Sequence, residues 1–228
     1  MSLTTAIRRL APARETASTT TPKPIDADLA GNLYMKDWIQ REIDAGNAEG
    51  FQVGALTTPI VGGGAGTVID LDQPEVNINV PAGKTIWLIR AHIQCEVPAD
   101  QDGDVQEIEI GYDNAGVTNA SSSTGTVTTP KNLRTDKTSL LLGGSAVVTA
   151  GTVNLSANPT VQEIARAQTV TNIVTSGITN KGFELLYEPK HPRPFVGPCA
   201  VLAYWGGTQA MSGFAQFEYI VNDTPPAS

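Results

Sequence analysis

The sequence is poor in the residue types that most often carry chemistry. Only two histidines and two cysteines occur among its 228 residues. A metal-dependent enzyme of the cupin type needs several histidines and a carboxylate close together, whereas His92 lies in a predicted strand and His191 in the Pro-rich stretch KHPRP. The Gly-x-Ser-x-Gly elbow of many hydrolases is also missing. We therefore predict no catalytic residue, no cofactor and no metal ligand, and expect the chain not to be an enzyme.

Charge and long apolar runs are also scarce. Charged residues make up 17% of the chain, against about 25% in an ordinary globular protein. The excess of acidic over basic residues gives a net charge of −8, and an acidic chain is a poor candidate for binding nucleic acid by counterion release. No apolar run approaches the ~18 residues of a membrane helix. The N-terminus lacks the apolar stretch of a secretion signal, so we expect synthesis in a cytoplasm and no membrane partner.

Residues 1–27 have the composition of an extended arm. Residues 16–24 read TASTTTPKP, a polar stretch broken by proline that offers no face to bury. Two interpretations are open: a tail without fixed structure, or an arm that becomes ordered against a neighbouring subunit. In the second interpretation the contact residues are Ile7, Arg8, Arg9 and Arg14.

Residues 28–50 contain the strongest helix signal and a linker. Between Asp28 and Gly46, apolar side chains recur at spacings of three and four, which line one side of a helix. These side chains are Leu29, Leu33, Met35, Trp38, Ile39 and Ile43. Gly46 stands where a left-handed C-terminal cap is expected. The apolar stripe either packs on its own domain or docks on a partner; in the second case the anchors are Tyr34, Trp38 and Ile39.

From residue 51 to 228 the hydrophobic period changes to two, which is typical of strands. The clearest strand is 85–97, where Trp87, Ile89, Ala91, Ile93, Cys95 and Val97 are predicted to share the buried face. Further strands are predicted at 108–112, 183–187, 200–205 and 215–221. Weaker candidates are 67–71, 76–80, 126–129, 140–142, 146–149, 152–155 and 169–174. One exception is 161–167, where Thr160 and Glu163 have capping-box spacing and predict a short helix.

This many short strands separated by Gly, Pro, Asn and Asp clusters favours an all-β fold. We predict a jelly-roll-like β-sandwich with an N-terminal extended arm and one α-helix in front of it. An immunoglobulin-like sandwich is the alternative, but the Cys…Trp…Cys spacing that would support it is missing.

Three features leave two interpretations each. The acidic stretch 100–109 fails the EF-hand pattern and is either a solvated turn or a looser calcium loop. Cys95 and Cys199 are either small core residues or a disulfide pair. The third feature is a set of aromatic residues near strand ends that either pack in the core or form a subunit contact: Phe195, Trp205 and Phe214.

The arrangement as a whole resembles bacteriophage virion jelly-roll proteins, and in particular head decoration (cement) proteins. The resemblance rests on the Thr/Pro-rich arm, the helix, the strand opening VPAGKTIWLIRAHI and the closing pair GPCAVLAYWGG and MSGFAQFEYIV. It implies a structural protein on the exterior of a capsid. Its partners would be the major capsid protein and copies of itself, as a homotrimer or homodimer.

Other functions stay open at this point. The alternatives are another virion subunit (tail, fibre-base or shell jelly roll), a carbohydrate-binding β-sandwich module and an enzyme. A sugar-binding module would keep its sugar binding after deletion of residues 1–46, whereas a decoration protein would no longer bind the capsid shell.

Overall fold

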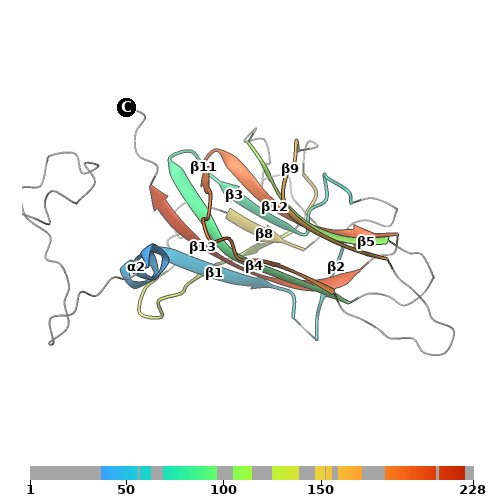
Figure 1. Ribbon diagram of the computed structural model, residues 1–228, viewed down its shortest axis with the longest axis horizontal. Coiled ribbons are helices and arrows are strands. Elements are labelled where there is room, and N and C mark those ends of the chain that lie inside the picture. Colours follow the sequence, from blue (N-terminus) through green and yellow to red (C-terminus); the bar gives the residue numbers. More distant parts are fainter. Residues whose placement is uncertain are drawn as a thin grey trace, which may run out of the picture. The chain divides into compact units, whose positions relative to one another are not determined.

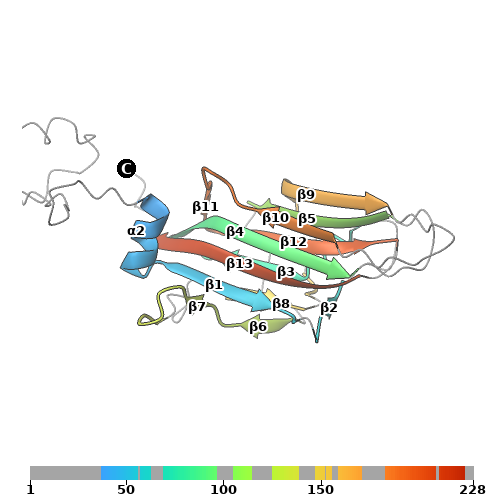
Figure 2. The same cartoon turned by 60° about the horizontal axis from the view of Figure 1, so that its bottom comes forward.

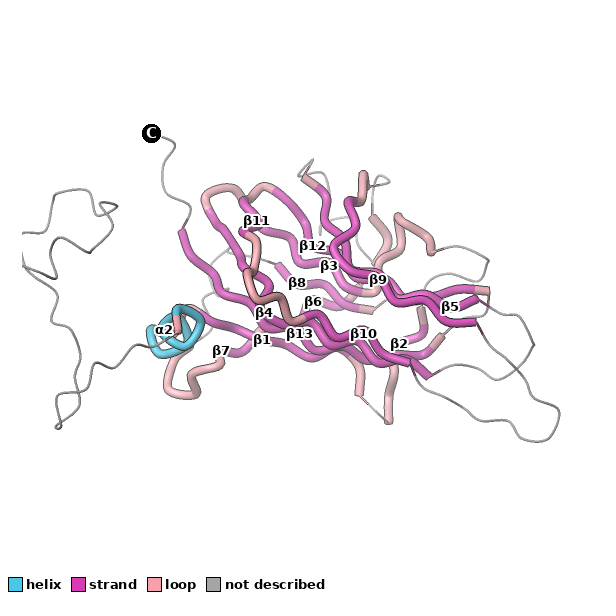
Figure 3. Tube along the Cα trace, in the orientation of Figure 1, coloured by secondary structure: helices cyan, strands magenta, loops and turns pink. Residues whose placement is uncertain are grey.

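The computed structural model describes residues 37–55, 57–62, 69–96, 105–114, 125–138, 147–151, 153–155, 159–170, 183–208 and 211–223. These residues form one helix and two antiparallel sheets, seen as two layers in Figure 3. The helix is α2 (Trp38–Ala45). The strands are β1 (Ala48–Val53), β2 (Ile60–Val61), β3 (Val76–Val80), β4 (Lys84–Glu96), β5 (Val105–Asp113), β6 (Thr126–Thr128), β7 (Lys131–Asn132), β8 (Val147–Ala150), β9 (Gln162–Val170), β10 (Phe183–Tyr187), β11 (Pro194–Val196), β12 (Cys199–Gly207) and β13 (Ser212–Asp223).

The strand order is that of a jelly roll. The first sheet has the order β10-β4-β13-β1-β7, and the second has the order β6-β8-β3-β12-β5-β9. Eight of these strands form the framework: β1, β3, β4, β5, β9, β10, β12 and β13. If these eight strands are numbered 1 to 8 in chain order, the first sheet has the order 1-8-3-6 (β1, β13, β4, β10). The second sheet has the order 2-7-4-5 (β3, β12, β5, β9). The prediction of a jelly-roll sandwich is therefore confirmed.

A long insertion between β5 and β9 widens both sheets. Its strands β6 and β8 extend the second sheet beside β3, and β7 extends the first sheet beside β1. Figure 2 shows β6, β7 and β8 on the opposite side of the sandwich from β9 and β10. The insertion therefore brings residues of 125–138 next to the start of β1.

The core lies between the sheets and is built from the alternate side chains of each strand. Phe51 of β1 stacks on Phe217 of β13, with ring centroids 5.2 Å apart. From the second sheet, Val201 and Ala203 enter the same cluster together with Trp205. Burial of this apolar surface is the main favourable term for the sandwich.

Strand β12 is buried on both sides, because the chain also covers the outer face of the second sheet. Leu202 and Tyr204 point away from the main core and form a second cluster with Val153 and Leu155. The covering segments are held by hydrogen bonds: Tyr204 Oη donates to the Leu71 carbonyl at 3.0 Å, and Leu155 N donates to the Asp72 carbonyl at 2.8 Å. We call this surface the covered face.

The predicted buried face of the longest strand is wrong in its first half. Ile86 and Leu88 enter the core, whereas Trp87 and Ile89 are half-buried on the other side. The cause is a β-bulge: Leu88 pairs with Tyr219 and Arg90 with Glu218, so that Ile89 is an extra residue. An extra residue reverses the alternation of faces, which is why the predicted pattern holds only from Ala91 onward.

The predicted helix at 161–167 is also wrong, because this segment belongs to β9. Ala165 and Ala167 pair with Ile110 and Ile108 of β5 and pack against the core. The Thr160 and Glu163 spacing matched a capping box by chance, and pairing with β5 overrides that local preference.

Strand β1 begins at Ala48, inside the predicted linker, and the compact unit that contains the sandwich begins at Trp38. The weaker strand predictions at 76–80, 126–129 and 146–149 match β3, β6 and β8. Of the predictions at 67–71 and 152–155, the described parts 69–71 and 153–155 are not strands. Of the prediction at 169–174, the described part 169–170 is the end of β9. The predicted helix start at Asp28 and the segment 140–142 lie outside the described residues.

Candidate interaction surfaces

Helix α2 packs on the outer face of the first sheet at the end where β1 begins and β13 ends (Figure 1). Trp38 meets Trp87 edge to face, with ring centroids 6.3 Å apart and an interplanar angle of 68°. Ala48 and Ile220 pair in the register of β1 and β13 and are fully buried, although neither belongs to the core between the sheets. Helix α2 therefore contacts the sheet through Trp87, whose outward position is created by the bulge.

The helix ends in a glycine cap that matches the sequence prediction. Gly46 has a φ of +83°, in the left-handed region. Its N–H donates to the Ile43 carbonyl at 2.9 Å, and Asn47 N donates to the Glu42 carbonyl at 2.9 Å. This pair of bonds is a Schellman motif, and it turns the chain directly into β1.

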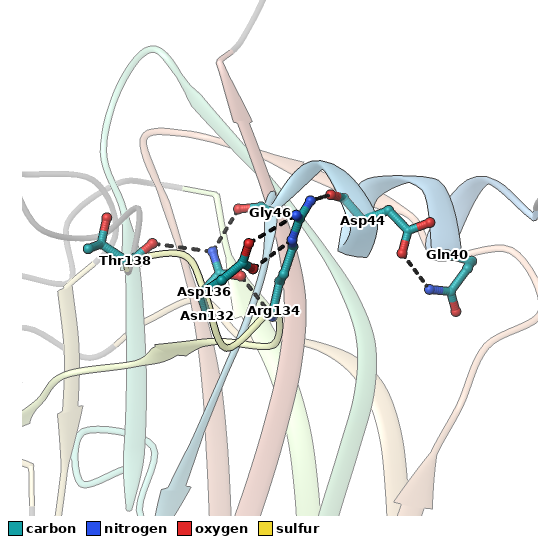
Figure 4. A network of polar contacts seen from close by, with 7 residues as sticks. All are labelled: Gln40, Asp44, Gly46, Asn132, Arg134, Asp136 and Thr138. Carbon is teal, nitrogen blue, oxygen red and sulfur yellow. Dashed lines mark hydrogen bonds and ion pairs between the residues drawn. The ribbon is translucent and has the colours of Figure 1, made fainter.

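Side chains from the insertion hold the same helix end (Figure 4). Asn132 Nδ2 donates to the Gly46 carbonyl at 2.7 Å. The Arg134 guanidinium donates to the Asp44 carbonyl and forms a two-point ion pair with Asp136, at 2.7 and 3.0 Å. A cation at a helix C-terminus also interacts favourably with the helix dipole. We call α2, Trp87, Asn132 and Arg134 the helix clamp.

The rest of that outer face carries polar and charged side chains in rows across the strands. We call it the open face. Its residues come from three neighbouring segments: Glu184 and Leu186 on β10 with Glu188 just after it, Arg90, His92 and Gln94 on β4, and Phe214, Gln216 and Glu218 on β13. This composition is typical of a sheet surface that is not covered by its own chain.

Close polar contacts cross-link the open face. Glu184 Oε2 lies 2.7 Å from His92 Nε2 and accepts from Gln94 Nε2 at 3.2 Å. Hydrogen bonding to His92, and then to Gln94, lowers the pKa of the Glu184 carboxyl. Arg90 lies between two carboxylates, 3.0 Å from Glu188 and 3.4 Å from Glu218. Leu186 lies between Glu184 and Glu188 in the chain and is 51% exposed.

The residues predicted from sequence to form interfaces are placed in different environments. Phe195 and Trp205 are 3% and 1% exposed and belong to the main core, which is the packing alternative that the sequence left open. Phe214 is half-buried on the open face, where it pairs with Gln94. On the helix, Trp38 and Ile39 are half-buried. The remaining predicted contacts lie outside the described residues: Ile7, Arg8, Arg9, Arg14 and Tyr34.

The cysteines are both free thiols in the core. Burial raises the pKa of both, that of Cys199 to about 11. A disulfide between Cys95 and Cys199 is therefore not formed, and neither thiol has the lowered pKa of a nucleophile.

The calcium hypothesis concerns a segment whose first part, 100–104, lies outside the described residues. In its second part, Glu107 and Glu109 are directed to the guanidinium of Arg166, at 3.4 and 3.3 Å. Within the described residues, no group of three or more His, Cys, Asp or Glu side chains is placed to hold a metal ion. In the same part of the chain, no helix has the length and apolar character needed to cross a membrane.

Comparisons with known proteins do not assign the chain to a family. No protein-family model matches it, and no curated protein is significantly similar in sequence.

Proposed function

We propose that the chain is a structural virion protein that binds the exterior of a phage capsid shell as a decoration protein. Its partners are the major capsid protein and further copies of itself, as a homodimer or homotrimer. The proposal is supported by the sequence resemblance to virion jelly-roll proteins and is compatible with the jelly-roll strand order.

The single observation that carries the proposal is the helix clamp. The N-terminal residues 1–36 join the sandwich at α2, which is held at its start by the contact between Trp38 and Trp87. At its end it is held by Asn132 and Arg134, which come from the insertion. The N-terminal segment is therefore continuous with a helix that is fixed to the sandwich at both ends. Such an anchored junction suits a strap between shell subunits.

The test is co-sedimentation with expanded heads of the phage that encodes the chain. We expect the full chain to sediment with the heads and a variant lacking residues 1–36 to stay in the supernatant. The matched control is a variant that lacks residues 224–228, which follow β13 and should not affect binding. Thermal melting reports whether both variants are folded.

Two results would overturn the proposal. The first is a full chain that does not sediment with heads. The second is binding of the full chain to glycans on an array without any association with heads, which would favour the carbohydrate-binding module.

A further inference from the structure

On the basis of the proposed function, we infer a docking site for the N-terminal segment: residues 7–14 of one copy bind the open face of a neighbouring copy at β10. Arg8 would pair with Glu188, and Leu10 would cover Leu186.

The surface around Leu186 has the chemistry of a binding site for a basic and aliphatic segment. Leu186 is half-exposed between two carboxylates of the same strand and its continuation. Both hydrogen bonds to Glu184 end on Oε2, and the ion pair of Glu188 ends on Oε1. Within the described part of the chain, each carboxylate therefore has a second oxygen that accepts no hydrogen bond. An arginine donor can use such an oxygen without displacing His92 or Arg90.

A second copy of β10 does not fit this surface. Antiparallel pairing of two β10 strands about Leu186 would place Glu184 opposite Glu188 of the other copy, and like charges directly opposite each other are destabilising. The charges therefore disfavour pairing of two β10 strands in this register and favour a positively charged segment.

The sequence of residues 7–14, IRRLAPAR, provides the required charge and spacing. It holds three arginines and no acidic residue. In an extended chain, side chains two residues apart share a face about 6.6 Å apart. Arg8 and Leu10 therefore match the step from Glu188 to Leu186.

The length of chain is sufficient to reach another copy. Leu10 precedes Trp38 by 28 positions (38 − 10), which span at most about 90 Å at ~3.3 Å per residue. The longest strand of the sandwich, β4, has 13 residues, equivalent to about 43 Å. A segment anchored at α2 can therefore extend past its own sandwich.

The experiment is disulfide cross-linking between two populations of the full chain, each with one added cysteine. One population carries Leu10→Cys and the other carries Leu186→Cys with a mass tag, so that a cross-link between copies has its own mobility. The native cysteines are buried and their raised thiol pKa values keep them out of the reaction. The matched control replaces Leu186→Cys by Val127→Cys, because Val127 is an aliphatic residue on β6 of the second sheet and is 66% exposed.

We expect the Leu10 and Leu186 pair to cross-link at least about tenfold more than the control pair, because docking raises the local concentration of the two thiols. The change Glu188→Lys in the Leu186→Cys population should abolish this excess. Adding Arg8→Glu to the Leu10→Cys population should restore it.

Two results would overturn the inference: equal yields for both pairs, or cross-linking of Leu186→Cys chains to each other. Head binding is scored separately. Cross-linking without head binding would support the docking site and reject the capsid function. Head binding without cross-linking would support the capsid function and reject the docking site.

Discussion

The two outer faces of the sandwich differ in what lies over them. On the second sheet, segments of the same chain cover Leu202 and Tyr204, and hydrogen bonds from Tyr204 and Leu155 hold these segments in place. On the first sheet, the corresponding outer positions carry Arg90, His92 and Gln94, which contact carboxylates of neighbouring strands. The helix clamp covers one end of this sheet.

This difference shows that the polarity of a strand's outward side chains indicates whether that face of the sheet is covered. Strand β12 is apolar on both sides, which is costly on a surface in contact with water but favourable between two apolar layers. Strand β4 alternates between apolar and polar residues after its bulge, so its outer side is stable in water. Within the described part of the chain, the open face can therefore take a partner without destabilising the free protein.

The largest effect is expected from shortening a side chain on the covered face. Leu202 is fully buried, and Leu202→Ala should reduce the free energy of unfolding by about 3 kcal/mol, from lost burial and a cavity. The matched change on the open face, Leu186→Ala, should stay within about 0.5 kcal/mol of the parent. Chemical denaturation measures both. Similar losses in the two variants would show that the faces are equally covered in solution.

A smaller loss is expected where the helix clamp covers the first sheet. Trp87→Ala removes the ring that Trp38 contacts and should cost about 2 kcal/mol, because Trp87 is only half-buried. Hydrogen exchange should accelerate in α2 and leave β12 protected. If β12 lost protection to the same extent, the clamp would be part of the global core and not a local cover.

Much of the fold could be predicted from periodicity, and the reasons for the exceptions are local. The strand at 76–80 and the apolar run at 200–205 were recognisable because their side chains alternate or are continuously apolar. The bulge at Ile89 was not, because an extra residue is defined by its partner strand: Leu88 and Arg90 face consecutive residues of β13. The position of Trp87 on the outer face, and with it the docking site of α2, therefore could not be predicted from one strand alone.

The candidate surfaces were less accessible to sequence reasoning. Large aromatic residues near strand ends suggested an interface, but Phe195 and Trp205 fill the core. The open face was visible only in part, as the alternation of Arg90, His92 and Gln94, because their partners Glu184 and Glu188 follow about 90 residues later in the chain. No short-range pattern links these two segments.

The glycine cap provides a test of how tightly the clamp fixes the helix end. Gly46→Ala places a Cβ at a φ of +83° and 2.9 Å from Cγ of Lys137, so the variant should lose about 1.5 kcal/mol. The control is Gly83→Ala, which has a φ of +82° and open space around the added carbon. A larger loss at Gly46 than at Gly83, measured by thermal melting, would reflect crowding by the insertion. Equal losses would mean that only backbone strain matters at both sites.

The free energy of unfolding should depend on pH through Glu109 of β5, which pairs with Arg166 of the edge strand β9. Burial raises the pKa of this carboxyl, and Arg166 counteracts the rise. The ionised form is therefore less stable in the folded than in the unfolded chain, and stability falls as the pH rises through the folded pKa. Arg166→Met removes the compensating charge and should cost about 1 kcal/mol at pH 7. The cost should vanish below about pH 3, where the carboxyl is protonated in both states. A difference that did not depend on pH would indicate lost packing of the arginine stem instead.

The smallest effect concerns the open face itself, where the pKa of Glu184 reports whether its cross-strand contacts persist in water. Its pKa is lowered mainly by the hydrogen bond with His92 and less by Gln94, so its contribution to stability is present at neutral pH and lost as the pH falls through the folded pKa. His92→Ala should raise the titration midpoint of Glu184, followed by carbon-detected NMR, and Gln94→Ala should raise it less. Because both partners are at the surface, added salt should reduce the part of the shift that comes from a charged His92. If neither substitution moved the midpoint, the rows of the open face would not be ordered before a partner arrives, and docking would have to order them at a cost in affinity.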